Sequence, residues 1–420
     1  MSFFSPLNVR VGFFLAVRQI RRASKWTTIL IVSVMVLTFL NLVAVTGVLV
    51  GLIEGISNSY RIQYTGDVII SPLSTKSYIL RSDDVLSLVR SLPQVTSVSP
   101  RYLRGGSVEA NYLTRADLNE KRNLTGAQII GINPAAEDEL SHLSDYVIKG
   151  QYLASSDYDQ VLIGAYLLEE YSFGEQPGLT PLKNIVPGTK VRLTIGDNTR
   201  EVIVKGIIKS KVDQISLSVY LNDGEFRQMA GVNNYDLSQI AIRLTQETDA
   251  AAFRDLLKRS GVGDGARVQT YIDAIPNAVA DITNTFAMLG NMISSIGLVV
   301  ASITIFIVIF INALTRRKFI GILKGIGISG AAIEISYVFQ SLFYATLGSG
   351  IGFALLYGLM VPYLYAHPID FPFSDGILYA PLPGTLVRIA LLVATTLIAG
   401  YIPARMIVQK NTLDSILGRN

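Results

Sequence analysis

Four long stretches rich in apolar residues divide this sequence. The first, residues 27–53, contains no charged residue, and the others cover residues 282–315, 335–366 and 384–404. Because a helix needs about 20 apolar residues to cross a bilayer, each stretch predicts a transmembrane helix. The first is too long for the apolar part of a signal peptide, and no small-residue cleavage site follows it, so we interpret it as an uncleaved anchor.

Basic residues gather in three short segments beside these helices. Lysine and arginine recur in residues 1–26, 316–334 and 405–420, whereas the loop 367–383 has two aspartates and no basic residue. Since short basic segments stay in the cytoplasm, both chain ends and the segment between the second and third helices are predicted inside. The long segment 54–281 is then predicted outside.

That outer segment alternates between strand-like and helix-like patterns. The expected elements near its two ends are strands at residues 67–71, 95–108, 240–244 and 267–271 and helices at residues 82–92 and 248–260. Ser82 is the expected cap of the first helix. The order is strand, helix, strand early and again late, a split βαβ arrangement typical of a ferredoxin-like sandwich.

Between these two ends the pattern favours short strands. Strand patterns occur at residues 128–132 and 159–164, and a Gly196-Asp197-Asn198 turn joins strands at 191–195 and 202–208 into a hairpin. We therefore predict a β-rich subdomain, about residues 112–225, inserted into the split βαβ unit. The fold class is an α-helical membrane protein with four transmembrane helices and a mixed α/β extracytoplasmic domain between helices 1 and 2.

The composition agrees with a membrane protein and removes several function classes. Half of the 420 residues are hydrophobic and 16% are charged, while Lys and Arg exceed Asp and Glu by only four. This excess fits basic cytoplasmic edges better than a nucleic-acid surface, so no nucleic acid is expected as a partner. The chain has no cysteine, and its two histidines, His142 and His367, are far apart. Disulfides and thiol chemistry are excluded, and no metal site is expected.

Motifs for nucleotide binding do not appear in a suitable context. The P-loop pattern is absent, and the G-x-G-x-x-G match at Gly325–Gly330 lies in a short basic loop between two membrane helices. A dinucleotide site needs a preceding strand within a βαβ unit. No G-x-S-x-G nucleophile elbow occurs either. We predict that the chain is not an enzyme and that any ATP hydrolysis belongs to another subunit.

The cytoplasmic segment 316–329 combines basic residues with an apolar stripe. Ile320, Leu323 and Gly327 recur at near-helical spacing beside Lys318 and Lys324, which predicts a short amphipathic helix. A basic loop that only sets the topology is the alternative. If the helix docks a cytoplasmic partner, the residues expected to couple to it are Arg317, Lys318, Ile320, Gly321, Leu323, Lys324 and Gly327.

Small and polar residues within the helices predict contacts between helices. Gly348 and Gly352 form a small-xxx-small pair that lets helices approach closely, either inside one bundle or as a dimer seam. Asn41 lies in the middle of the first helix, where a hydrogen bond to a neighbouring helix is more common than a role in a substrate path. Both interpretations of the glycine pair stay open.

The segment 316–329 also resembles a motif of the MacB/LolC–LolE/FtsX-type permeases of ABC transporters, R-R-x-E-I-G-I-L-[RK]-A-x-G-[AI]-S. Residues 401–405 followed by 411–416 are similar to that family's Y-P-A-[RK]…P-x-x-[AS]-[IL] signature. Two departures stand out: Phe319 replaces the usual Glu, and Thr412 replaces the usual Pro. The first puts in doubt a salt bridge from position 319 to the ATPase.

The resemblance implies a function. Two such permeases, identical or paralogous, would flank a shared centre above an ABC ATPase dimer that holds the ATP and Mg, so this chain would bind no cofactor. ATPase closure would push the cytoplasmic helix, and the long first and second helices would carry the movement outward. The substrate would be a lipid, a lipoprotein or another amphiphile at the periplasmic side of the bacterial inner membrane.

Two alternatives belong to other function classes. An FtsX-like regulator would couple the ATPase to a periplasmic protein partner without transport. A membrane-anchored receptor would have no ATPase, but it would need neither four helices nor the amphipathic segment 316–329.

The predicted organisation combines all these boundaries. Its parts are a cytoplasmic segment 1–26, transmembrane helices 27–53, 282–315, 335–366 and 384–404, the extracytoplasmic domain 54–281 with its insertion at about 112–225, the coupling helix 316–334, the outer loop 367–383 and the tail 405–420.

Overall fold

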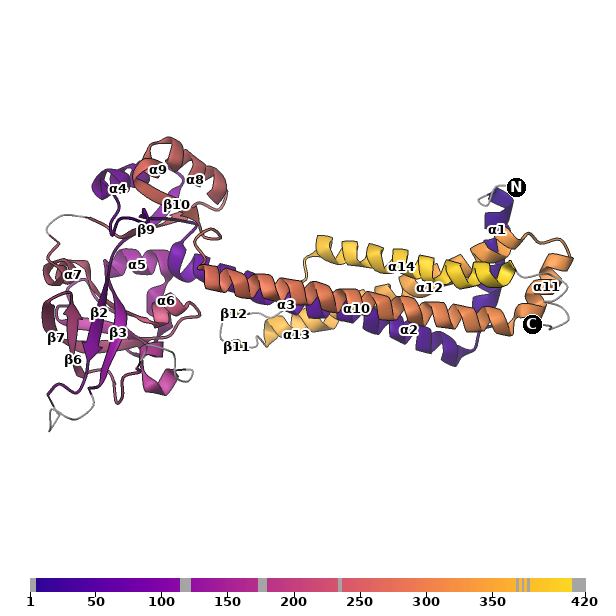
Figure 1. Cartoon of the computed structure of the whole chain (residues 1–420), viewed down its shortest axis with the longest axis horizontal. Helices are drawn as coiled ribbons and strands as arrows, with labels where there is room; N and C mark the ends of the chain where they lie inside the picture. The colour runs from indigo at the N-terminus through magenta and orange to yellow at the C-terminus, as the bar shows by residue number, and fades with distance from the viewer. Residues whose placement is uncertain are drawn as a thin grey trace. The chain divides into compact units, whose positions relative to one another are not determined.

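The computed structural model describes residues 5–113, 122–172, 180–232, 236–367, 370–371, 374–375 and 378–409. It divides into two compact units (Figure 1). The membrane unit is Met1–Glu54, Asp281–Phe371 and Asp375–Asn420, and the outer domain is Gly55–Ala280 with Pro372–Ser374.

In the described part of the chain, four helices are long and apolar enough to cross a membrane. They run over Lys25–Thr65, Val279–Thr315, Gly330–Ala366 and Leu382–Val408. Their regular segments are α2 (Lys25–Leu40), the π-helix η1 (Asn41–Val45), α3 (Thr46–Tyr60), the π-helix η2 (Arg61–Thr65), α10 (Asn277–Thr315), α12 (Gly330–Leu355), the π-helix η6 (Leu356–Met360), α13 (Val361–Ala366) and α14 (Leu382–Val408). The four helices and the mixed α/β domain between the first and second confirm the predicted fold class.

Several serine and threonine hydroxyls inside these helices donate to their own backbone. The hydroxyl of Thr38 donates to Val34 O at 2.8 Å, and those of Ser341 and Ser349 donate to the carbonyls four residues earlier at 2.9 and 2.7 Å. Since lipid offers no hydrogen-bond partner, this local bonding lets hydroxyl groups lie in an apolar helix.

Two further helices complete the membrane unit. The helix α11 (Arg317–Gly325) joins α10 to α12, and α1 (Pro6–Arg21) precedes α2. Helix α1 is not among the elements predicted above, although the sequence contains a start signal for it. Ser5 accepts a hydrogen bond from Asn8 N and Pro6 occupies the first helical position, as in many helix N-termini.

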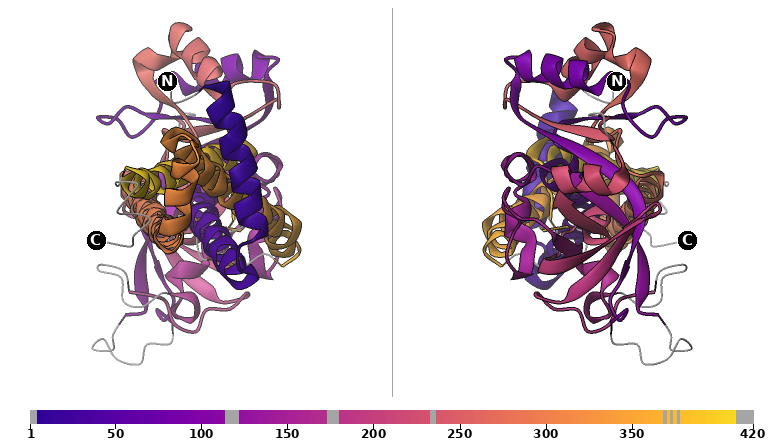
Figure 2. Two further views of the ribbon diagram at one scale, coloured as in Figure 1. Left: turned by 90° about the vertical axis from the view of Figure 1, so that its right-hand side faces the viewer. Right: turned by 90° about the vertical axis from the view of Figure 1, so that its left-hand side faces the viewer.

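The outer domain is built on a mixed sheet in the order β10-β1-β9-β2-β3-β8-β5-β7-β4, with β6 pairing with β2 and β7. The strands are β1 (Val68–Pro72), β2 (Val95–Glu109), β3 (Leu124–Ile132), β4 (Val147–Gly150), β5 (Gln160–Gly164), β6 (Lys190–Ile195), β7 (Asn198–Ile208), β8 (Ser218–Asn222), β9 (Gln239–Leu244) and β10 (Ala266–Thr270). Helices α4 (Ser82–Ser91), α8 (Ala250–Arg259) and α9 (Val262–Gly265) lie together at one end of the domain in both views of Figure 2.

The first four strands in that order form the split βαβ unit. Helix α4 connects β1 to β2 and α8 leads from β9 towards β10, while β1 pairs antiparallel with both β9 and β10. Ser82 is not the cap of α4. The cap position belongs to Arg81 in a left-handed conformation, and the Ser82 hydroxyl instead accepts a hydrogen bond from Leu237 N at 3.2 Å.

The inserted strands continue the same sheet as the split βαβ unit. Strand β2 is 15 residues long, and its first half, Val95–Arg101, pairs with β9. Its second half pairs with β3 and, from Gly106 to Glu109, with β6. Gly106 allows this close crossing because a Cβ there would lie 2.3 Å from Thr194 O. One long strand therefore belongs to both halves of the domain.

The helices α5 (Pro134–Ser141), α6 (Asp213–Ser216) and α7 (Asp223–Ala230) complete the inserted half. The main core of the domain joins α4 and α8 to the sheet through side chains such as Val89, Phe253 and Ile70. A smaller core forms where the end of the first long helix meets the inserted strands. It contains Tyr60 and Tyr64 from the helix end and Ile130, Leu162 and Tyr220 from the sheet.

Candidate functional site

The short helix α11 has one buried side and one exposed side. Ile320, Gly321 and Leu323 are buried against the membrane unit, whereas the side chains of Phe319 and Ile322 are 50% and 52% exposed. An exposed apolar face on a short basic helix is typical of a docking surface, because contact with water alone does not favour it.

The end of α11 has a defined geometry. Gly327 takes φ +95°, a left-handed conformation that glycine adopts without a Cβ penalty. Its N–H donates to Lys324 O at 3.1 Å, and the N–H of Ile328 donates to Leu323 O at 3.0 Å. These two hydrogen bonds form a Schellman motif, which ends the helix and turns the chain towards α12.

A side-chain contact ties α11 to the last long helix. The Nζ of Lys324 donates a 2.7 Å hydrogen bond to the carbonyl of Val408, the final residue of α14. A cation is favoured there because helix C-termini carry partial negative charge. Arg317 is half-buried and Lys318 is exposed. Among the seven predicted coupling residues, the structure thus buries three, uses Lys324 and Gly327 to hold the helix, and leaves Lys318 accessible.

The connection from α11 to α12 is braced by the N-terminal helix α1. Ser329 caps α12 by accepting from Ala332 N at 3.2 Å, and its hydroxyl donates to Asn8 Oδ1 on α1 at 2.7 Å. Further along, Gly12 packs so closely on α12 that a Cβ would lie 2.7 Å from Ile335 Cγ2. The helix α1 is therefore part of the framework around α11.

Gly348 and Gly352 form a packing contact within the chain. A Cβ on Gly348 would lie 2.3 Å from Met35 Cβ, and one on Gly352 would lie 2.4 Å from Phe39 Cδ1. Both partners belong to α2. In this chain the glycine pair packs against α2, and the dimer seam stays a prediction.

Asn41 lies where the first and second long helices meet. It opens the π-helix η1, and a Cβ on Gly297 of α10 would lie 2.6 Å from its Oδ1. One turn further out, the hydroxyls of Thr46 and Ser294 are 2.6 Å apart. A groove of about 410 Å³ runs beside Asn41 between these helices, with Val34 and Ile296 in its walls. The first two long helices are therefore linked by polar contacts as well as by packing.

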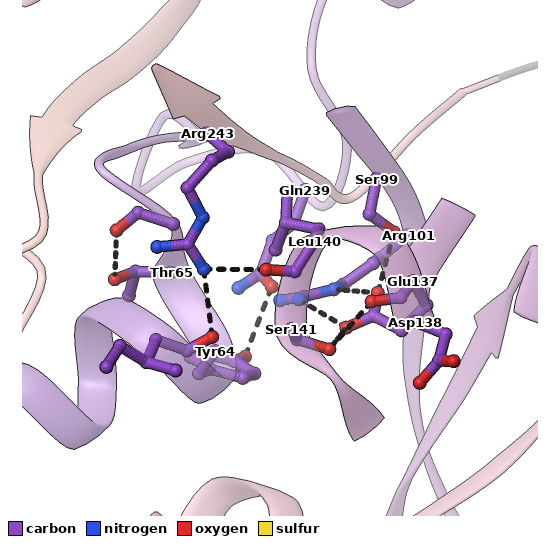
Figure 3. A network of polar contacts seen from close by, with 12 residues as sticks. Tyr64, Thr65, Ser99, Arg101, Glu137, Asp138, Leu140, Ser141, Gln239 and Arg243 are labelled. Atoms are coloured by element: carbon purple, nitrogen blue, oxygen red, sulfur yellow. Dashed lines mark hydrogen bonds and ion pairs between the residues drawn. The ribbon is translucent and has the colours of Figure 1, made fainter. Parts of the chain in front are cut away.

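Within the outer domain, the end of the first long helix is held by side chains of the sheet and loops (Figure 3). Tyr60 Oη donates to Gln214 Oε1 at 2.6 Å, and Tyr64 Oη donates to Gln239 Oε1 at 3.1 Å. Arg243 on β9 donates to Ile62 O at 3.0 Å and to Leu140 O at 2.6 Å. These contacts connect the helix end to both halves of the domain.

A buried ion pair lies directly beside this helix end. Arg101 on β2 makes two hydrogen bonds to the Glu137 carboxylate at 2.6 and 2.7 Å, and its guanidinium lies 4.8 Å from the Tyr64 ring centre. Ser99 and Ser141 donate to the same carboxylate at 2.6 and 2.9 Å. Burial alone would lower the pKa of Arg101, but the negative charge of Glu137 raises it, so the guanidinium stays charged.

The sequence reasoning missed both the buried pair and the residues that hold the helix end. A signal was present in β2, where Ser97, Ser99 and Arg101 occupy alternate positions of an otherwise core-forming strand. Alternate positions face the same side of a sheet, so this polar row indicates a polar contact under one face. The partner Glu137 lies 36 residues away, and nothing local in the sequence indicates it.

No group of side chains in the described ranges is arranged to hold a metal ion. Residues 411–416, which carry the tail signature, lie outside the described residues. The described part of the site therefore consists of a short helix with an exposed apolar face, two linked long helices and a buried polar contact at the end of the first long helix.

Models of two known protein families match segments in both units of the chain. The family model of the MacB-like periplasmic core domain matches residues 28–260, more than half of the chain, and that of the FtsX-like permease C-terminal region matches residues 291–412. Among solved structures, the periplasmic region of MacB from Actinobacillus actinomycetemcomitans is similar at 16% identity, with 49% of this chain and 87% of that chain covered and a TM-score of 0.34. A search of curated proteins finds no match.

Proposed function

Since this chain belongs to the family of ABC permeases with a MacB-like periplasmic core domain and an FtsX-like C-terminal region, we propose that it transmits movements of an ABC ATPase to its periplasmic domain. It is a multi-pass membrane protein. In our proposal both chain ends are cytoplasmic, in a bacterial inner membrane. The family implies the ATPase partner, and ATP and Mg would be bound by that partner.

The observation that carries this proposal is the two-sided character of α11. One side of α11 is buried, its end is held to α14 through Lys324, and Gly327 ends the helix through a hydrogen bond to Lys324 O. The opposite face of the helix and its C-terminal end expose the side chains of Phe319, Ile322 and Ile326. A partner that pushes on this exposed face would move the attached helices instead of bending a loose loop.

The long helices that join the membrane unit to the periplasmic domain support the same function. Helix α10 is 39 residues long and ends at Thr315, directly before α11. At 1.5 Å per residue its length is roughly 60 Å, about twice the hydrocarbon core of a bilayer. At the outer end of the first long helix, Tyr60, Tyr64 and Arg243 make hydrogen bonds that would pass a displacement of the helix to the sheet.

We propose that the complex contains two permeases, identical or paralogous, and an ATPase dimer. The work would be done on a lipid, a lipoprotein or another amphiphile that the periplasmic domain extracts or expels, without passage through the bilayer. Because α10 runs without a break from the periplasmic domain to Thr315, just before α11, mechanotransmission fits this chain.

The exposed face of α11 offers a direct test. We expect Phe319→Asp and Ile322→Asp to abolish co-purification of the ATPase with the full-length permease, because a buried interface would then contain unpaired charges. Substitutions such as Gly321→Arg or Leu323→Asp would test docking less directly. Both positions are buried within the chain, so a change there would also disturb the permease itself. Ile148→Asp, at an exposed position in the outer domain, is the matched control. ATPase recovery at the wild-type level in both α11 variants would contradict the docking assignment.

A second measurement distinguishes transport from regulation. The ATPase activity of the reconstituted complex should rise with a lipid, a lipoprotein or a small amphiphile if the permease acts on such a substrate. For an FtsX-like regulator it should rise only with a periplasmic protein partner. Stimulation by the protein alone would replace the transport proposal with the regulatory one.

A further inference from the structure

A small basic pocket opens on the proposed cytoplasmic side of the membrane unit, and Phe319 of the exposed apolar face of α11 forms part of its wall. Its volume is about 240 Å³, and its walls come from the end of α1 and from the junction of α10 with α11. The lining residues are Leu15, Arg18, Gln19, Arg22, Arg316 and Phe319. Three positive charges and no carboxylate therefore surround one cavity.

The polar groups of the pocket are donors. Arginine offers only N–H groups. Gln19 is 7% exposed, and its Oε1 is already used as the acceptor of a 2.5 Å hydrogen bond from Gln340 Nε2. Its own amide N–H groups make no side-chain hydrogen bond among the described residues, so they remain available at the pocket. Four donor side chains without an acceptor favour an anion.

The residues around the pocket indicate that the pocket lies at the level of the membrane surface. Residue 22 lies three positions before α2, which begins at Lys25. Trp26 is 82% exposed, as expected of an aromatic anchor in the interface. The helix α1 exposes Leu7, Phe13 and Phe14, the mark of a helix that lies in the headgroup region.

We propose that this pocket binds the phosphate headgroup of an anionic phospholipid of the inner leaflet. The arginines would hold the phosphate and Gln19 would donate to it, while Leu15 and Phe319 would contact the start of an acyl chain. Basic pockets beside membrane helices on the cytoplasmic side commonly bind such headgroups. The exposed apolar side chains of α1 favour a lipid over an acidic protein surface, which would leave them uncovered.

Phe319 has a particular role in this proposal. A carboxylate at this position would lie in the wall of the pocket and neutralise the arginines. The phenyl ring instead leaves the positive charge available and adds an apolar surface. Since one wall of the pocket belongs to α11, a bound lipid would also connect α1 to the helix that docks the ATPase. The binding site itself requires only a membrane-embedded chain and does not depend on the proposed function.

Binding of dioleoylphosphatidylglycerol and dioleoylphosphatidylcholine to the full-length permease in detergent, measured by native mass spectrometry, tests the proposal. We expect the wild type to prefer the anionic lipid. Each arginine near an anionic membrane surface changes binding about fivefold, so Arg18→Gln/Arg22→Gln/Arg316→Gln should weaken it about a hundredfold. Arg21→Gln is the matched control, because Arg21 is exposed on α1 but does not line the pocket. It should bind almost as the wild type does.

Two single variants cover the case in which the triple variant does not fold. Arg22→Gln at an exposed position should weaken binding of the anionic lipid about fivefold. Phe319→Glu should weaken it further by adding a negative charge to the wall. Wild-type lipid preference in both variants would overturn the proposal.

Two further arms distinguish other ligands. Inorganic phosphate should not raise the melting temperature of the detergent-solubilised wild type, whereas the anionic lipid should raise it by several degrees. Equal stabilisation by free phosphate would replace the lipid with a soluble anion. If Arg22→Gln loses the ATPase but keeps wild-type lipid binding, the pocket is a protein contact and the proposal is wrong.

Discussion

The outer domain pairs its buried charges across long sequence separations, whereas many hydroxyl groups of the membrane helices bond within their own helix. In the outer domain, Arg101 and Glu137 are joined across 36 residues of sequence, and Tyr64 bonds to Gln239 across 175. In the membrane unit, Thr38, Ser341 and Ser349 bond to carbonyls only four residues earlier. The domain depends on partners that folding brings together, whereas the helices satisfy most hydroxyl groups before they pack.

Because of this difference, we expect different kinds of substitution to destabilise the two units. A buried charge in the domain is stable only while its distant partner is present. In the membrane unit, where lipid is as apolar as the helices, contact depends on the shape of small residues such as Gly348 and Gly352. Charge changes should therefore disturb the domain most, and size changes should disturb the helix bundle most.

The largest effect is expected from Arg101→Met. The variant leaves the Glu137 carboxylate buried without its counter-ion, which should lower the free energy of unfolding of the outer domain by about 3–5 kcal/mol. Hydrogen exchange of the full-length protein, read in the strands of the outer domain, measures the change. The double variant Arg101→Met/Glu137→Leu should recover most of the loss, and Arg81→Gln, in an exposed pair with Asp84, should have little effect. A small loss in the single variant would refute the contrast.

The free energy of unfolding of the outer domain should depend on pH because of Glu225. The side chain of this residue is fully buried near Arg200 and Asp159. Burial raises the pKa of Glu225 to about 7, although Arg200 attracts the carboxylate and offsets part of that rise. Because the folded state binds the proton more tightly than the unfolded state, this group favours folding below about pH 4.5. Its contribution is lost as pH rises to 7, by up to about 3 kcal/mol.

Proteolysis of the outer domain in the full-length protein at pH 5 and pH 8 tests this pH dependence. Glu225→Gln should reduce the difference between the two pH values, because the amide does not titrate. Glu169→Gln, at an exposed position, should leave the difference as it is. An unchanged pH dependence in Glu225→Gln would assign it to another group.

Enlarging a tightly packed glycine should destabilise the membrane unit. Gly352→Val places side-chain atoms where a Cβ alone would lie 2.4 Å from Phe39, so we expect a loss of about 1–3 kcal/mol. Gly350→Val is the matched control, since a Cβ on Gly350 meets nothing within 4 Å. The melting temperatures of both variants in detergent give the comparison. Equal melting temperatures would mean that the glycine contact does not hold these helices together.

The smallest effect is expected at the end of α11. Gly327→Ala forces a Cβ into a left-handed conformation, which costs about 1 kcal/mol. Hydrogen exchange should accelerate in α11, while Gly325→Ala, inside the helix with open space around it, should slow it slightly. If both variants behave alike, the Schellman motif is not what orders this helix.

Much of the architecture follows from the sequence because its signals are local. Runs of apolar residues place the four long helices, and alternation with turn residues places β1, β2, β9 and β10 of the split unit. The amphipathic spacing around Ile320 and Leu323 indicates α11, in which these two side chains are buried, whereas Gly327 of the predicted stripe is exposed. These features depend on periodicity within about twenty residues, which a single chain displays directly.

Contacts between distant residues were decided by the tertiary structure alone. Strand β2 joins both halves of the domain in one sheet because its 15 residues pair with β9, β3 and β6, and no local pattern marks where one partner replaces another. The Arg101–Glu137 pair, the contact of Gly352 with Phe39 and the pocket between α1 and α11 likewise unite residues far apart in sequence. Local periodicity determines which elements form, but the partner of a buried charge or a small residue depends on how those elements pack.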